Sequence, residues 1–140
     1  MKVDGREICV LAVDDDEGVR LLLSVVLTEE GCRVLTASDG VEAAEILKAE
    51  PVDLLITDYA MPRMNGLDLI RWTRACFRDV ETVLITGHDD PALLAEAGAC
   101  GALRVFLKPF PIETIVSLAA EIRRTPPSLK IAPSIPSARR

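Results

Sequence analysis

The chain has 140 residues, of which 49% are hydrophobic, so it is long enough to form one domain with its own core. Its net charge of −6 argues against a nucleic acid as the main partner. We find no apolar run of membrane-spanning length, no secretory signal and no C-x-x-C pair among the four cysteines, so we expect a cytoplasmic protein without a membrane partner.

Five short runs rich in Val, Ile and Leu, each bounded by turn residues, predict five β-strands. The runs are Ile8–Val13, Arg33–Ala37, Val52–Thr57, Thr82–Thr86 and Leu103–Leu107. Three of them are almost continuously apolar, which is typical of parallel strands covered on both faces.

A helical pattern follows each of these runs. In the first pattern Val19, Leu22, Leu23, Val26 and Leu27 recur at helical spacing up to Gly31, a residue typical of helix C-caps. The four later helices are expected to begin near Val41, Gly66, Pro91 and Ile112. Strands that alternate with helices predict an α/β fold, a doubly wound parallel sheet with helices on both faces.

The composition changes after Arg124. Residues 125–140 include four prolines and three serines, and they show no core-forming pattern. We therefore expect residues 1–124 to form the domain and residues 125–140 to form a Pro-rich, basic, flexible tail that does not dock.

Polar residues stand where four of the five predicted strands end. They are Asp14, Asp15 and Asp16 after the first strand, Asp58 after the third, Thr86 at the fourth, where Gly87 follows, and Lys108 after the fifth, where Pro109 follows. Open parallel sheets bind ligands beyond the carboxyl ends of their strands, so we expect these residues to share one pocket.

Such a pocket would concentrate negative charge. Two carboxylates about 4 Å apart repel by about 4 kcal/mol at an effective dielectric constant of about 20. Mg²⁺ relieves this repulsion, because it prefers oxygen ligands and commonly joins one or two carboxylates to a phosphate. A carboxylate nucleophile, a metal, a lysine and a hydroxyl together suit phosphoryl transfer.

Four motifs in order carry a resemblance to a known family. They are VDDD (Val13–Asp16), ITDYAMPRMNG (Ile56–Gly66), LITG (Leu84–Gly87) and FLKPF (Phe106–Phe110). With them the chain resembles the receiver domain of bacterial two-component response regulators, of the stand-alone chemotaxis-receiver type, over residues 8–124. The resemblance implies a five-stranded flavodoxin-like sheet of strand order 2-1-3-4-5.

The resemblance also implies a role for each site residue. Asp58 would accept the phosphoryl group. The metal ligands for Mg²⁺, or Mn²⁺ in its place, would be Asp14, Asp15, Asp58 and the backbone carbonyl of Ala60. The phosphoryl group would be held by Thr86 and Lys108, with Gly87 leaving the site open and a cis peptide bond between Lys108 and Pro109.

One position departs from the family pattern. Receivers commonly carry an aromatic residue three positions before this lysine, where the chain has Val105. The neighbouring Phe106 would point to the opposite face of its strand, so we expect it in the core and expect no aromatic switch. The signal should instead pass through the Thr86–Gly87 loop and the following helix, which Gly98 weakens by about 1 kcal/mol relative to alanine.

The implied function is a signalling switch. A histidine kinase or phosphotransfer protein would phosphorylate the chain, which would then bind an unidentified output protein as a monomer or weak dimer. The chain would be no enzyme beyond catalysing its own phosphorylation and dephosphorylation.

Four alternatives remain open. A flavodoxin-like flavin binder should favour phosphate at its first turn, where the acids of this chain would repel it. A metal-dependent phosphatase with an aspartate nucleophile would place that residue on the first strand and need a cap. The other two alternatives are a pseudo-receiver that acts by binding alone and a receiver segment of a larger regulator or hybrid kinase.

Overall fold

The computed structural model describes residues 5–126, 129 and 131–135. The strands are β1 (Cys9–Val13), β2 (Arg33–Ala37), β3 (Leu54–Asp58), β4 (Glu81–Thr86) and β5 (Arg104–Leu107). The helices are α1 (Glu17–Glu29), α2 (Gly40–Ala49), α3 (Gly66–Cys76), α4 (Pro91–Cys100) and α5 (Ile112–Arg124). Strand and helix therefore alternate as the sequence predicts.

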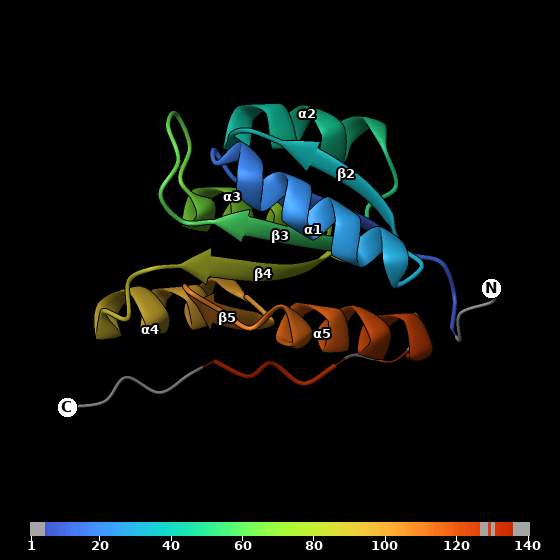
Figure 1. Ribbon diagram of the computed structural model, residues 1–140. Helices are drawn as coiled ribbons and strands as arrows, with labels where there is room; N and C mark the ends of the chain where they lie inside the picture. The colour runs from blue at the N-terminus through green and yellow to red at the C-terminus, as the bar shows by residue number, and fades with distance from the viewer. Residues whose placement is uncertain (1–4, 127–128, 130, 136–140) are drawn as a thin grey trace.

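The five strands form one parallel sheet in the order β2-β1-β3-β4-β5. Helices α1 and α5 cover one face of the sheet, and α2, α3 and α4 cover the other (Figure 1). This arrangement confirms the predicted doubly wound sheet and its strand order. In the part of the chain that the structure describes, no helix combines the length and the hydropathy that a membrane span requires.

Strand β3 shows how the apolar runs serve both layers. Leu54 and Ile56 pack on the side of α1 and α5, whereas Leu55 packs on the side of α2 and α3. All five residues of the strand are buried, Asp58 included. A central strand of this kind is continuously apolar because both of its faces are covered.

Helix α1 buries less of its apolar surface than expected. Leu23 and Leu27 are buried, but Leu22 is 48% exposed, and Leu21 and Val25 are exposed beside it. Leu21, Leu22 and Leu23 are consecutive, and successive residues of a helix are rotated by about 100° around its axis. The three side chains therefore cannot all face the sheet. Leu22 therefore belongs to the helical pattern of the sequence without facing the core.

Residues 131–135 lie along the outer edge of β5. The Ser134 amide donates to the Leu103 carbonyl at 2.8 Å, and Ile131 and Ile135 pack against the core. For these residues the expectation of an undocked tail is wrong. Ile131 and Ile135 are four residues apart with a proline between them, and two apolar residues are too few to establish a helical or strand pattern, so the sequence gives no sign of docking. Residues 127, 128, 130 and 136–140 of the expected tail lie outside the described part of the chain.

Candidate functional site

The predicted site residues meet at the carboxyl edge of the sheet. Asp58 is the last residue of β3 and Thr86 the last residue of β4. Asp14 directly follows β1 and Lys108 directly follows β5. Asp14 and Asp58 are buried and Asp15 is exposed, so the three acids line the floor and the rim of one site.

Three carboxylates form a cluster that suits a metal ion. Asp14, Asp15 and Asp58 each offer an oxygen, and these oxygens lie within 4.8 Å of one another. The donor set consists of oxygen alone, which matches the preference of Mg²⁺ and Mn²⁺ for hard ligands. The Asp16 amide donates to Asp14 Oδ1 at 2.9 Å and so fixes the orientation of that carboxylate.

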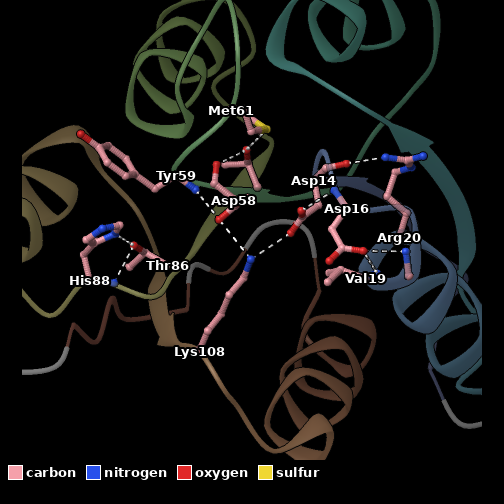
Figure 2. Close-up of polar contacts among 12 residues, drawn as sticks. Asp14, Asp16, Val19, Arg20, Asp58, Tyr59, Met61, Thr86, His88 and Lys108 are labelled. Atoms are coloured by element: carbon pink, nitrogen blue, oxygen red, sulfur yellow. Dashed lines mark hydrogen bonds and ion pairs between the residues drawn. The ribbon is translucent and has the colours of Figure 1, made fainter.

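Lys108 supplies the positive charge of the cluster. Its Nζ lies 3.3 Å from Asp14 Oδ2 and 3.3 Å from Asp58 Oδ1 (Figure 2). Burial lowers the pKa of Lys108, but the neighbouring Asp58 and Asp14 outweigh this effect, and the pKa is raised overall. The lysine is therefore held as a cation between the two acids.

Burial raises the pKa of Asp58, and the charge of Asp14 raises it further. Lys108 and the Tyr59 amide, which donates to Asp58 Oδ1 at 2.9 Å, oppose this rise in pKa without cancelling it. The site thus carries more negative charge than its lysine neutralises, which favours the entry of a cation.

The loop after Asp58 is closed on itself. The Gly66 amide donates to the Tyr59 carbonyl at 2.9 Å, and the Asn65 side chain accepts from the Asp68 amide to start α3. Arg63 has a φ of 72° and reaches Asp39 at 2.7 Å. These contacts fix the loop beside the site, so Ala60, whose carbonyl is an expected metal ligand, belongs to a constrained segment.

Thr86 is engaged by a residue to which sequence reasoning gave no role. Its Oγ1 accepts from the His88 amide at 3.0 Å and lies 3.3 Å from His88 Nδ1 (Figure 2). The His88 ring also makes an edge contact with Tyr59, with ring centroids 6.2 Å apart. Spacing alone could not reveal this contact, because it depends on the turn after β4.

Arg20 is a second residue that the sequence analysis missed. Its Nη1 donates to the Asp14 carbonyl at 2.7 Å and so ties α1 to the acidic turn (Figure 2). An arginine one turn into a helix gives no signal in the sequence, because such residues usually face solvent.

Val105 and Phe106 lie on opposite faces of β5. Val105 is buried against α4, and no aromatic ring occupies this position. Phe106 is only half-buried, with its ring centroid 6.4 Å from that of Phe110. Phe106 packs against the core cluster of α1 and α5, as expected, but it is only partly buried because β5 is an edge strand.

Gly87 and Pro109 complete the set of expected site residues. A side chain at Gly87 would meet no atom within 4 Å, so the turn after β4 is open. The Lys108–Pro109 peptide bond is cis.

The geometry agrees with the comparisons to known proteins. The family model of the response regulator receiver domain matches residues 10–131. The chain belongs to the response regulator receiver domain family.

Individual relatives fall within the same family. Sporulation initiation phosphotransferase F of Bacillus subtilis is 31% identical over 106 residues, which are 76% of this chain and 86% of that protein. Response regulator MprA of Mycobacterium leprae is 36% identical over 84% of this chain, which spans only 52% of that relative's length. The structure of chemotaxis response regulator CheY4 of Vibrio cholerae has a TM-score of 0.77 and 30% identity, over 83% of this chain and 98% of that one.

Proposed function

We propose that the chain is a phosphorylation-dependent signalling switch in which Asp58 is the phosphoacceptor. The observation that carries the proposal is the cluster of Asp14, Asp15 and Asp58 with Lys108 between two of these carboxylates. Membership of the receiver family and the name of the phosphotransferase relative support phosphoryl transfer as the chemistry. The donor is a histidine kinase or a phosphotransfer protein.

The geometry suggests which oxygen of Asp58 reacts. Asp58 Oδ1 accepts from the Tyr59 amide and pairs with Lys108, so we assign Oδ2 as the oxygen that attacks phosphorus. The new Oδ2–P bond forms while the P–N bond to the donor's imidazole breaks, and the imidazole keeps the electron pair and takes up a proton.

Two side chains then hold the transferred group. Lys108 moves its ammonium from the carboxylates to a phosphoryl oxygen, and Thr86 leaves His88 to donate its hydroxyl to another. A bound Mg²⁺ or Mn²⁺, held by the three carboxylates and the Ala60 carbonyl, would neutralise charge that develops on the phosphoryl oxygens. Attack of water on phosphorus later releases inorganic phosphate and restores Asp58.

The proposal also covers how the signal is passed on, where the protein is located and whether it is part of a larger regulator. The chain acts only on its own acyl phosphate and passes the signal on by protein–protein contact. We place it in the reducing cytoplasm, a location that its four free cysteines fit. A receiver segment of a larger regulator is the second candidate, because the chain spans about half of its mycobacterial relative.

Intact-mass spectrometry tests the proposal. Incubation with Mg²⁺ and a small acyl phosphate should add one phosphoryl group to the wild type and none to Asp58→Asn. Asp68→Asn is the matched control, since Asp68 is exposed on α3, and it should gain the group like the wild type. The assignment fails if the wild type gains no group or if Asp58→Asn gains as much as the wild type.

A further inference from the structure

The outer edge of β5 is covered by the chain itself. β5 is the last strand of the sheet, and such edges present unpaired backbone groups to any strand that can add to them. Ser134 forms a parallel bridge with Arg104, and its amide donates to the Leu103 carbonyl at 2.8 Å. The red segment in Figure 1 passes along α5 toward α4, so it follows this edge.

Two isoleucines hold the segment from opposite sides. Ile131 packs on the core cluster that includes α1 and α5, whereas Ile135 packs on the cluster that includes α3 and α4. Ile135 lies over Gly98, where an added methyl group would be 3.8 Å from Ile135 Cγ1. Gly98 therefore forms a seat on α4 for this branched side chain, with room left for one methyl group.

Arg104 holds the backbone between the isoleucines. Its Nη1 donates to the Ala132 carbonyl at 3.0 Å, and its Nη2 lies 3.6 Å from Glu121 Oε1. Ala132, Pro133 and Ser134 are exposed. The surface thus contacts the backbone of the segment and two branched side chains that are four residues apart. The side chains of the three residues between them point to solvent, so the surface does not discriminate among side chains at these positions.

We propose that the edge of β5, with Arg104 and the seat at Gly98, is a binding surface for an extended strand, and that residues 131–135 occupy it in cis. A partner that fits it carries an extended segment with two branched apolar side chains at the spacing of Ile131 and Ile135. It adds to β5 by backbone hydrogen bonds, as in β-strand addition. It binds only after the chain's own segment leaves.

The contacts are few enough for the segment to be displaced. A short connection nonetheless gives a tethered segment an effective concentration in the mM range. Releasing the segment should therefore strengthen the binding of a free strand by about tenfold or more.

Amide NMR spectra of the full-length chain test the proposal. The variant Ile135→Asp should shift the amide signals of Gly98, Leu103 and Arg104, because it removes the contact with α4. The variant Ala132→Asp adds the same charge at an exposed side chain and should leave these signals in place. Ser134→Pro, which removes the amide donor, should reproduce the effect of Ile135→Asp.

The probe is a synthetic peptide with the sequence of residues 129–140. It should return the signals of Ile135→Asp toward their wild-type positions, at a concentration at least about tenfold below that needed to perturb the wild type. Unshifted signals in both disrupting variants, or a peptide that affects the wild type and Ile135→Asp alike or neither, would overturn the proposal. A wild-type dimer that is absent in Ile135→Asp would overturn occupation in cis, because the segment would then come from a second copy.

Discussion

Thr86 and His88 show how a single residue can restrain the site. In the proposed function, the Thr86 hydroxyl leaves His88 before it donates to a phosphoryl group on Asp58. Two contacts hold the Thr86 hydroxyl in place. One is with Nδ1 of the His88 ring, and the other is with the His88 backbone amide. The His88 side chain therefore opposes the movement of the Thr86 hydroxyl away from His88. The backbone contact remains when the side chain of residue 88 is replaced.

We predict that His88→Ala accelerates the phosphorylation of Asp58. Loss of one hydrogen bond of about 1 kcal/mol corresponds to a rate increase of about fivefold, provided that the bond is broken in the transition state. The measurement is the rate of adduct formation with a small acyl phosphate at saturating Mg²⁺. His88→Asn retains an acceptor near Thr86 and serves as the control. A rate for His88→Ala equal to or below that of the wild type would show that His88 does not restrain Thr86.

The Asp58 carboxylate weakens the metal-free fold. Burial and Asp14 raise its pKa, so stability present at low pH is lost as pH rises through the raised folded pKa. Asp58→Asn should therefore increase the free energy of unfolding at pH 7 by roughly 1 kcal/mol, while Lys108 keeps Asp14 as a partner. The gain should shrink as the pH falls toward 4 and vanish at lower pH, where the carboxyl becomes neutral in the unfolded state as well.

Urea unfolding of both proteins at pH 7 and pH 4, without divalent metal, provides the measurement. Saturating Mg²⁺ should narrow the difference at pH 7, because the ion stabilises the wild type. A destabilised Asp58→Asn at pH 7 would show that the ion pair with Lys108 outweighs burial.

At the scale of elements, two glycines in helices serve different purposes. Gly98 lies inside α4, and a methyl group there would make ordinary contact with Ile135. Gly66 begins α3, and a methyl group there would overlap the Asp58 carbonyl oxygen. The first glycine weakens a helix, whereas the second permits the closed loop beside Asp58.

We predict opposite effects for the two alanine substitutions. Gly98→Ala should stabilise the protein by about 0.5–1 kcal/mol, because alanine restricts the unfolded chain and favours the helix. Gly66→Ala should destabilise it by several kcal/mol, about 3 or more, because the backbone of β3 or α3 must move. Thermal unfolding decides both. An unchanged stability of Gly66→Ala would show that the loop after Asp58 can move at little cost. A lower stability of Gly98→Ala would show that Ile135 cannot pack against a methyl group at position 98.

Most element boundaries could be predicted from the sequence, because they are local. Pro91 after Asp90 marks the start of α4, and the Asp90 side chain does accept from the Ala92 amide. The exposed Leu22 and the half-buried Phe106 could not be predicted, since their burial depends on how far neighbouring elements extend. Arg123 is buried in α5 and donates to the Arg6 and Glu30 carbonyls, contacts that join segments distant in sequence.

At the scale of the whole molecule, the site and the edge of the sheet share two elements. β5 leads from Arg104, which holds the docked segment, to Lys108, which holds the carboxylates. The Lys108 amide donates to the Thr86 carbonyl at 2.8 Å. A movement of the Thr86 backbone would therefore displace the end of β5. Helix α4 follows the Thr86 turn and carries the seat at Gly98.

We predict that phosphorylation changes amide exchange mainly in residues 87–101 and at Ser134. Val105 is small and branched, so no ring can swing beside β5, and the movement of Thr86 should pass into the following loop and α4. Hydrogen exchange before and after phosphorylation, followed by mass spectrometry, is the measurement. Changes confined to Val105 and Phe106 would show that β5 alone carries the signal.

The convergence of the acids and Lys108 could be predicted from the sequence, whereas the contacts that support them could not. Strand ends of a parallel sheet converge by topology, so the motifs sufficed to bring Asp14, Asp58 and Lys108 together. The contacts of His88 and Arg20 depend on the path of a turn and on a side-chain rotamer. The docking of residues 131–135 depends on which strand forms the open edge of the sheet.

The central claim is that Asp58, among the three clustered acids, carries the phosphoryl group. An acyl phosphate is reduced by borohydride to an alcohol, which converts the modified aspartate into homoserine. Protein treated with Mg²⁺ and a small acyl phosphate, then with borohydride, should yield homoserine at position 58 in peptide sequencing by mass spectrometry. Homoserine at position 14 or 15, or at none of the three, would contradict the account.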